Sequence, residues 1–239
     1  MEGFNRESRQ SIYFEVTYVL AHEWPSDTME RLEFQKLLTQ NQLDFPQTTA
    51  TASSFSLIRT EQSPLQVKMT SLGPRVSNIS VSAKKPVDSL ELFSKEAEAI
   101  CDAYRQIWLK QPCQMLQCSA RIRHLYSCRE HAFKYLWEDR LGQDPEDFAL
   151  LGKRPVLGGG LRLVMPPVKA DSEPAHIEIK IESFFPELAK IFIETSFVWP
   201  KPRLITESER FEPESRLELV EKYAAGEVCD FLLRPREQA

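Results

Sequence analysis

The sequence predicts an α+β protein made of two halves, residues 1–111 and 112–239, each running strand, helix, three strands, helix. Three observations predict this fold. Short segments alternate apolar and polar residues, two long segments repeat apolar residues every three or four positions, and the connections between neighbouring strands are short enough for antiparallel hairpins. The repeated order suggests an internal duplication within one compact unit, with antiparallel sheets packed on long helices. The alternative is a single mixed sheet without internal symmetry.

The first half opens with a strand, because apolar and polar residues alternate over residues 11–20. Asp27 and Glu30 form a capping box that predicts the start of the first helix. The longest helix is expected over residues 88–110, where a second capping box begins at Asp88. Three shorter strands are predicted between the two helices, at residues 53–62, 65–71 and 75–84.

The second half repeats this order of elements. Its first strand is expected over residues 114–126, followed by a helix that ends at Gly142 and a short helix over residues 144–152. Three strands are predicted next, at residues 156–167, 175–184 and 190–200. A closing helix is predicted over residues 213–235, with a bend near Gly226.

Composition restricts the classes of function. The formal net charge of −5 disfavours nucleic-acid binding by the whole surface, although a local basic patch could still bind. The polar N-terminus shows no secretory signal, and no apolar run reaches the roughly 18 residues of a membrane span. The five cysteines are an odd number, which favours reduced thiols over a disulfide framework. We therefore predict a cytoplasmic protein that does not act in a membrane.

The segment 112–131 holds three cysteines and two histidines. Two interpretations are considered: a metal site, or a strand that happens to carry cysteines. Alternation places Cys118 on an apolar face, which predicts a half-buried strand with Cys118 in the core and Cys113 on the opposite face. A structural zinc site needs about four converging ligands, commonly from closely spaced cysteine pairs, and this segment has no such pair. We predict a strand with no metal; the alternative is a site near a helix start that includes Cys128 and His131.

A cluster of three glycines, Gly158, Gly159 and Gly160, is the second feature that could carry chemistry. A phosphate-binding loop would continue into a helix with a defined spacing of glycines, whereas strand-like residues follow here. A bulge or a close approach of two backbones is the favoured interpretation. Arg154 and Arg162 lie nearby in the sequence, so an anion site formed by these five residues is the alternative.

Arg121 and Arg123 share the exposed face of the strand predicted in the segment above. Two arginines on a sheet surface could contact a nucleic-acid backbone or an acidic partner. The aromatic residues that stack bases in such sheets are missing beside them, so solvated charges paired with nearby carboxylates are the favoured interpretation.

No complete catalytic or cofactor pattern is present. There is no nucleophile elbow, and His176 begins an H-x-E sequence without the downstream P-C-x-x-C that a zinc deaminase needs. We assign no catalytic residue, no cofactor and no metal, and we regard the question of an enzyme as open, with the balance against one.

Three segments follow the layout of a known family: LQCSARIRHLYS, HIEIKIESFFPELAKIFIETSF and LELVEKYAAGEVCDFLL. In this order the chain resembles a family of uncharacterised, sporadically distributed bacterial proteins of about this length. That family has an arginine-rich RLGLRYIN-like segment where the first of these lies; here His124, Leu125 and Tyr126 replace its tyrosine-isoleucine-asparagine ending. The resemblance implies a bacterial, cytosolic setting and no particular activity or substrate.

The leading hypothesis from the sequence is a non-enzymatic binding or scaffold protein that acts through a protein partner, a second copy of itself or a small ligand. One alternative is an enzyme with dispersed catalytic residues that acts on a phosphorylated substrate, as a hydrolase or a transferase. The other is RNA or DNA binding through the strand that carries Arg121 and Arg123.

Overall fold

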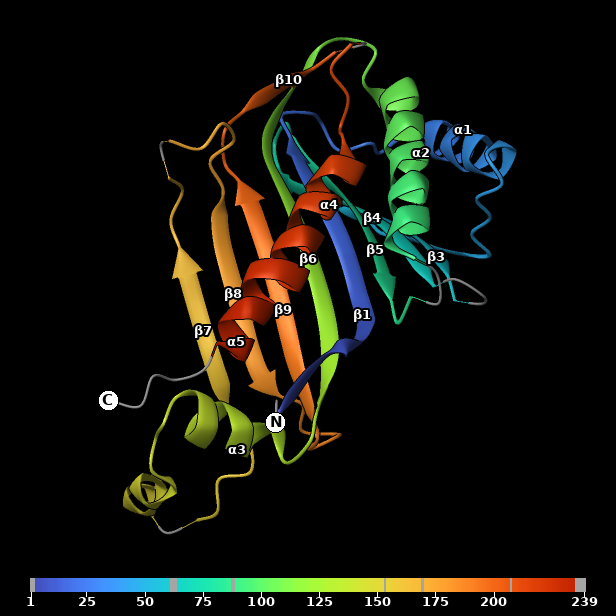
Figure 1. Ribbon diagram of the computed structural model, residues 1–239. Coiled ribbons are helices and arrows are strands. Elements are labelled where there is room, and N and C mark those ends of the chain that lie inside the picture. Colours follow the sequence, from blue (N-terminus) through green and yellow to red (C-terminus); the bar gives the residue numbers. More distant parts are fainter. Residues whose placement is uncertain are drawn as a thin grey trace.

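The computed structural model describes residues 3–60, 64–86, 89–152, 154–168, 170–206 and 208–234, and within them ten strands form one antiparallel sheet (Figure 1). Asp88, the expected start of the second capping box, lies outside the described residues. Helices and a large antiparallel sheet together confirm the α+β class.

The strand order is β2-β3-β4-β5-β1-β6-β9-β8-β7, and the short β10 also pairs with β6. The expectation of a separate sheet for each half is wrong, because the first strands of the two halves, β1 and β6, pair with each other at the centre. This pairing satisfies the backbone groups of both strands, which would otherwise be sheet edges. The strands are β1 (Phe4–Leu20), β2 (Gln47–Ala50), β3 (Ser54–Arg59), β4 (Leu65–Gly73), β5 (Val76–Lys84), β6 (Cys113–Cys128), β7 (Gly160–Met165), β8 (His176–Ser183), β9 (Lys190–Trp199) and β10 (Arg203–Ile205).

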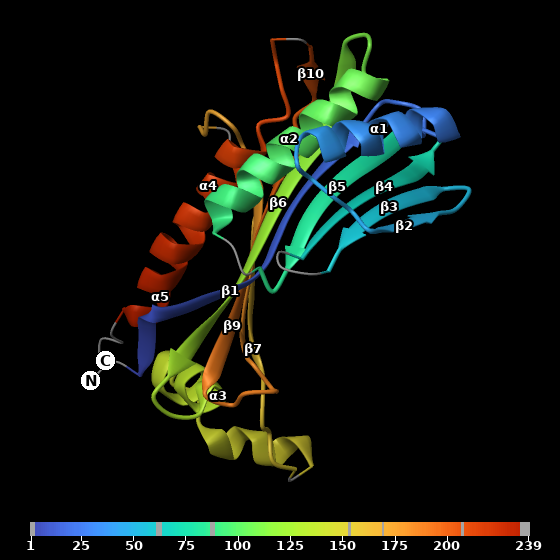
Figure 2. The same ribbon diagram turned by 90° about the vertical axis from the view of Figure 1, so that its right-hand side faces the viewer.

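Three helices, α1, α2 and α4, lie along one face of the sheet (Figure 2). Asp27 caps α1 as predicted, because its side chain accepts hydrogen bonds from the backbone N–H groups of Met29 and Glu30. The closing helix is interrupted by a π-helical turn that contains Gly226. The helical elements are α1 (Thr28–Gln40), α2 (Leu90–Trp108), α3 (Ala132–Lys134), η1 (Tyr135–Arg140), η2 (Pro145–Leu151), α4 (Pro213–Tyr223), η3 (Ala224–Val228) and α5 (Cys229–Leu233). No helix among the described residues has the length and apolar character needed to cross a membrane.

The core lies between this face and the helices, and alternation along the strands supplies it. Phe14, Val16 and Tyr18 of β1 point toward the helices, where Phe14 packs against Phe93 of α2. Tyr18 makes an edge-on contact with Phe211, just before α4. A second cluster at the other end of the sheet joins β8 and β9 to α3, η1 and α5. Both clusters contain residues from before and after position 111.

The cysteine segment forms strand β6, and Cys118 lies in the core as predicted. The prediction for Cys113 is wrong: Cys113 is buried in the same cluster as Cys118. The register explains the difference, since Val19 pairs with Gln117 but Leu20 pairs with Met115, leaving one extra residue in β6. This bulge reverses the alternation, so residues before it point to the opposite side from the one a regular strand would give.

Gly160, at the start of β7, pairs with Glu182 of β8. A Cβ atom at this position would stand 2.0 Å from the carbonyl oxygen of Ile181 and 2.6 Å from the Cα atom of Glu182. Both neighbours are backbone atoms of the paired strand, which cannot move aside as a flexible side chain can. The close approach of two backbones therefore explains this glycine.

We predict that Gly160→Ala lowers the free energy of unfolding by about 1–3 kcal/mol, because the added methyl group must push β7 away from β8. Gly226→Ala is the matched control, since a Cβ there meets nothing within 4 Å. The control should be neutral or stabilising by up to about 1 kcal/mol, as alanine favours helix. Urea unfolding of both variants measures the difference, and equal effects would contradict this account of Gly160.

Candidate functional site

The side of the sheet turned away from α1, α2 and α4, here called the open face, carries polar side chains at its centre. Arg121 and Arg123 of β6 point to this side, as the alternation of the strand predicted. Glu15 of β1 lies directly opposite Arg121, and Glu194 of β9 directly opposite Arg123. Cross-strand pairs of opposite charge stabilise neighbouring strands. The open face therefore holds its charges in an ordered array.

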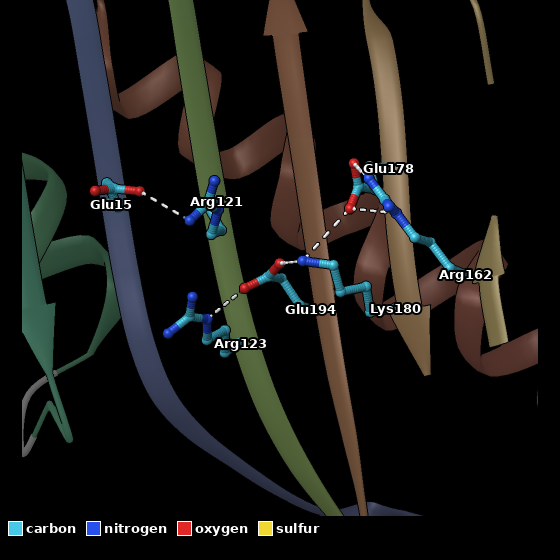
Figure 3. A network of polar contacts seen from close by, with 7 residues as sticks. All are labelled: Glu15, Arg121, Arg123, Arg162, Glu178, Lys180 and Glu194. Carbon is cyan, nitrogen blue, oxygen red and sulfur yellow. Dashed lines mark hydrogen bonds and ion pairs between the residues drawn. The ribbon is translucent and has the colours of Figure 1, made fainter. Parts of the chain in front are cut away.

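Five of these charged side chains form a continuous network over β6, β9, β8 and β7 (Figure 3). Glu194 accepts hydrogen bonds from Arg123 Nε at 2.5 Å and from Lys180 Nζ at 2.7 Å. Lys180 Nζ also lies 3.4 Å from Glu178, which accepts two hydrogen bonds from Arg162 at 3.0 and 2.9 Å. Arg121 forms a separate, longer ion pair of 3.7 Å with Glu15.

Glu194 is the centre of this network and is only 4% exposed. Burial would raise the pKa of its carboxyl group, but hydrogen bonds from Lys180 and Arg123 outweigh burial and hold the pKa below the ordinary value. The same hydrogen bond raises the pKa of the Lys180 ammonium. Arg123 is further fixed by the ring of Tyr13, whose centroid is 4.4 Å from the guanidinium carbon. The network thus holds Arg123 in one position.

Arg123 also lines a groove of about 980 Å³. Apolar side chains contributed by β1, β6 and β9 include Tyr13, Leu125 and Phe192. The lining contains four cations and one carboxylate, Glu187. The full lining is Gln10, Ser11, Ile12, Tyr13, Lys84, Lys85, Pro86, Ser89, Arg123, Leu125, Phe184, Pro186, Glu187, Lys190 and Phe192. An apolar surface with an excess of positive charge is suited to a ligand that is both apolar and anionic.

Two of the four cations, Lys84 and Lys85, form no ion pair within the described part of the chain. Both are exposed, and they follow each other at the end of β5. Lys190 instead contacts Glu187 at 2.8 Å and the side chain of Gln10 at 3.5 Å. In the part of the chain that the structure describes, therefore, no carboxylate neutralises these two ammonium groups of the groove.

The structure brings together only some of the candidate residues. Arg121, Arg123 and Arg162 lie on one face, but each is paired with a carboxylate. Arg154 is an exposed loop residue. The N–H group of Gly159 donates to Ser183 Oγ at 3.1 Å, so the glycine segment offers one donor fewer to a phosphate.

Gly158 and Gly159 lie in the loop before β7, and Gly160 begins that strand. Neither the glycine segment nor Arg154 lines the groove. An anion contact by these residues stays a prediction.

Among the described residues, no group of three or more histidine, cysteine, aspartate or glutamate side chains is placed to hold a metal ion. Cys128 is buried at the end of β6, and His131 precedes α3 as its N-cap residue. Burial raises the pKa of the Cys128 thiol to about 12, which disfavours the thiolate that a metal would need.

One polar cluster was not predicted from the sequence. Ser11 Oγ lies 3.2 Å from His124 Nδ1, and His124 Nε2 lies 2.8 Å from a carboxylate oxygen of Glu221 on α4. A serine, a histidine and a carboxylate in a chain have the components of a nucleophilic triad. His124, however, is 0% exposed on the helix side of the sheet, and the cluster links α4 to β6 and β1. We interpret it as a structural link.

Apart from Arg123, the groove residues were also missed by the sequence analysis. They come from β1, the end of β5, the N-cap of α2, β6, β9 and the turn between β8 and β9, so no local motif joins them. The basic pair Lys84-Lys85 before a proline was the one local signal.

Comparison with known proteins adds no constraint: no family model, no curated protein and no solved structure matches the chain.

We predict that Glu194→Gln lowers the free energy of unfolding by about 1–3 kcal/mol at pH 7, because two charged donors lose their charged partner. The folded-state pKa of Glu194 lies below its ordinary value of 4.5, so its contribution is complete above that value and is lost as the pH falls through the lower, folded-state pKa. Between pH 6 and pH 3 the variant should therefore lose less stability than the native protein.

Glu91→Gln is the control, because Glu91 forms an exposed pair with Lys95 on α2. It should change the urea midpoint little at either pH. An equal dependence on pH in the native protein and in Glu194→Gln would show that Glu194 is not held as a carboxylate by the network.

Proposed function

We propose that the protein is a non-enzymatic binding protein whose groove on the open face holds an anionic, partly apolar portion of its partner. The observation that carries this proposal is the groove itself: about 980 Å³, with Leu125 and Phe192 among its apolar residues and with Lys84 and Lys85, which have no ion pair to a described residue, beside them. Its volume is at the upper end of the range typical of ligand sites, about 300–1,000 Å³.

The network of Figure 3 supports the proposal by fixing one wall of this groove. Arg123 is held between Glu194 and the ring of Tyr13, so its position does not have to be ordered when a ligand binds. A site that is ordered beforehand loses less side-chain entropy on binding. Lys84 and Lys85 supply the attraction for an anion, since they have no carboxylate partner among the described residues.

The two alternatives have weaker support. Nucleic-acid binding through Arg121 and Arg123 would have to compete with Glu15 and Glu194, which already neutralise these guanidinium groups. An enzyme for phosphorylated substrates that used the glycine segment would have to replace two contacts, that of Gly159 with Ser183 and that of Arg162 with Glu178. Both remain hypotheses with fewer favourable observations than the groove.

The proposal includes a bacterial cytoplasmic setting. It is supported by the resemblance of the sequence segments described above and by the five cysteines, all of which are buried and free of disulfides. Proteins of a reducing compartment keep their thiols in this form.

The proposal also includes a duplicated architecture. Each half runs from a central strand through a helical segment and a set of further strands to a covering helix, and β5-β1 on one side of the centre corresponds to β9-β6 on the other. Superposing the Cα atoms of β1, β4, β5 and α2 on those of β6, β8, β9 and α4 tests the idea. A match only with reversed chain directions would contradict duplication.

We predict that 1-anilinonaphthalene-8-sulfonate, an apolar anion, binds the native protein at one site and that Lys84→Glu with Lys85→Glu weakens binding about tenfold through charge repulsion. Lys36→Glu with Lys68→Glu is the control, since it changes the net charge equally at exposed positions outside the groove lining. Fluorescence titration measures both, with near-UV circular dichroism to confirm native packing. Absence of binding, or equal weakening in both variants, would contradict the proposed function.

A further inference from the structure

We propose that the partner enters the groove as an extended acidic peptide segment that adds as a strand to the uncovered edge of β1. This inference rests on the proposed function and specifies the class of ligand. It is carried by an observation that charge and volume alone do not give: the central strand β1 is longer than its neighbour β5.

β1 runs from Phe4 to Leu20, and β6 pairs with it from end to end except at residues 6–9 and at Ile12, where the register shifts. β5 pairs with it only from Tyr13 to Leu20. Within the described residues, therefore, no strand covers the β5 side of β1 before Tyr13. The last backbone contact on that side is a hydrogen bond of 2.8 Å from Lys85 N to the carbonyl oxygen of Ile12.

The end of β5 explains why β5 does not pair with β1 before Tyr13. Lys85 has a φ of 49°, in the left-handed region, and Pro86 follows it without a backbone N–H group. Pro86 therefore has no N–H group to donate to β1, and regular pairing of β5 with β1 ends here. Gln10, Ser11 and Ile12, which no described strand pairs with on the β5 side of β1, all line the groove.

A strand edge of this kind binds an extended peptide through main-chain hydrogen bonds, while pockets for alternate side chains give specificity. Tyr13, Leu125 and Phe192 offer apolar contacts, and Lys84 and Lys85 offer charge. Successive side chains of a strand point to opposite sides, so the best ligand alternates apolar and acidic residues. A small amphiphilic anion would use the same charges and apolar contacts but not the edge of β1.

The test uses the full chain and a capped peptide of about seven residues that alternates valine and glutamate. Two further versions carry N-methyl groups on alternate residues, one on the glutamates and one on the valines, because a strand bound at one edge donates only from every second N–H group. We expect one methylated peptide to bind at least about tenfold more weakly and the other to remain within about threefold of the parent. Hydrogen exchange of those Gln10–Ile12 amides that point away from β6 should slow on binding of the parent peptide.

Lys84→Glu with Lys85→Glu should weaken the parent peptide about tenfold, and a valine–lysine peptide should not bind. Equal binding of the parent and both methylated peptides would overturn strand addition while leaving a groove for anions in place. If 1-anilinonaphthalene-8-sulfonate binds and the parent peptide does not, the peptide inference fails alone. If neither binds, the proposed function fails with it.

Discussion

The pairing of β1 with β6 is the constraint on which the rest of the structure depends. These two strands are the longest in the sheet, at 17 and 16 residues, and their pairing extends from Phe4 opposite Cys128 to Leu20 opposite Met115. Each is also the strand on which its own half of the sheet is built. Without this contact the chain would present two smaller sheets with uncovered central edges, which is an unfavourable arrangement for backbone hydrogen bonding.

The two faces of the sheet follow from this pairing. Alternation along β1 and β6 sends the apolar set, including Phe14, Ala120 and Ile122, toward the helices and sends the charged set toward the open face. On the open face the charges pair across strands and form an ordered network. The groove arises at the same centre, because β1 continues beside β6 after β5 has ended. Fold and candidate site therefore share one structural cause.

The sequence predicted secondary structure and strand faces correctly where these depend only on neighbouring residues. Alternation predicted that β6 is a strand with Cys118 inside and Arg121 outside, and the capping box at Asp27 predicted the start of α1. It was insufficient where tertiary structure intervenes. A one-residue bulge in β6 places the side chain of Cys113 on the face opposite to the predicted one. No local pattern in the sequence reveals a bulge in an otherwise regular strand.

The groove could not be predicted for a related reason. Lys84, Arg123 and Lys190 are widely separated in the sequence and become neighbours only through the order of strands in the sheet. The joining of both strand sets into one sheet was likewise hidden, since alternation shows that a strand has two faces but not which strand will lie beside it. The sequence thus predicted the faces of individual strands, and the structure supplied their neighbours.

The most direct test of the central arrangement is the reactivity of two adjacent positions of β6 toward iodoacetamide. Cys118 faces the core, where burial raises the pKa of its thiol to about 12, whereas Ser119 faces the open side of the sheet. In the folded Ser119→Cys variant, mass spectrometry of the labelled peptide should find the introduced thiol modified rapidly and Cys118 protected until the protein unfolds. Equal labelling of both thiols in the folded protein would contradict a central strand with one face buried and the other open.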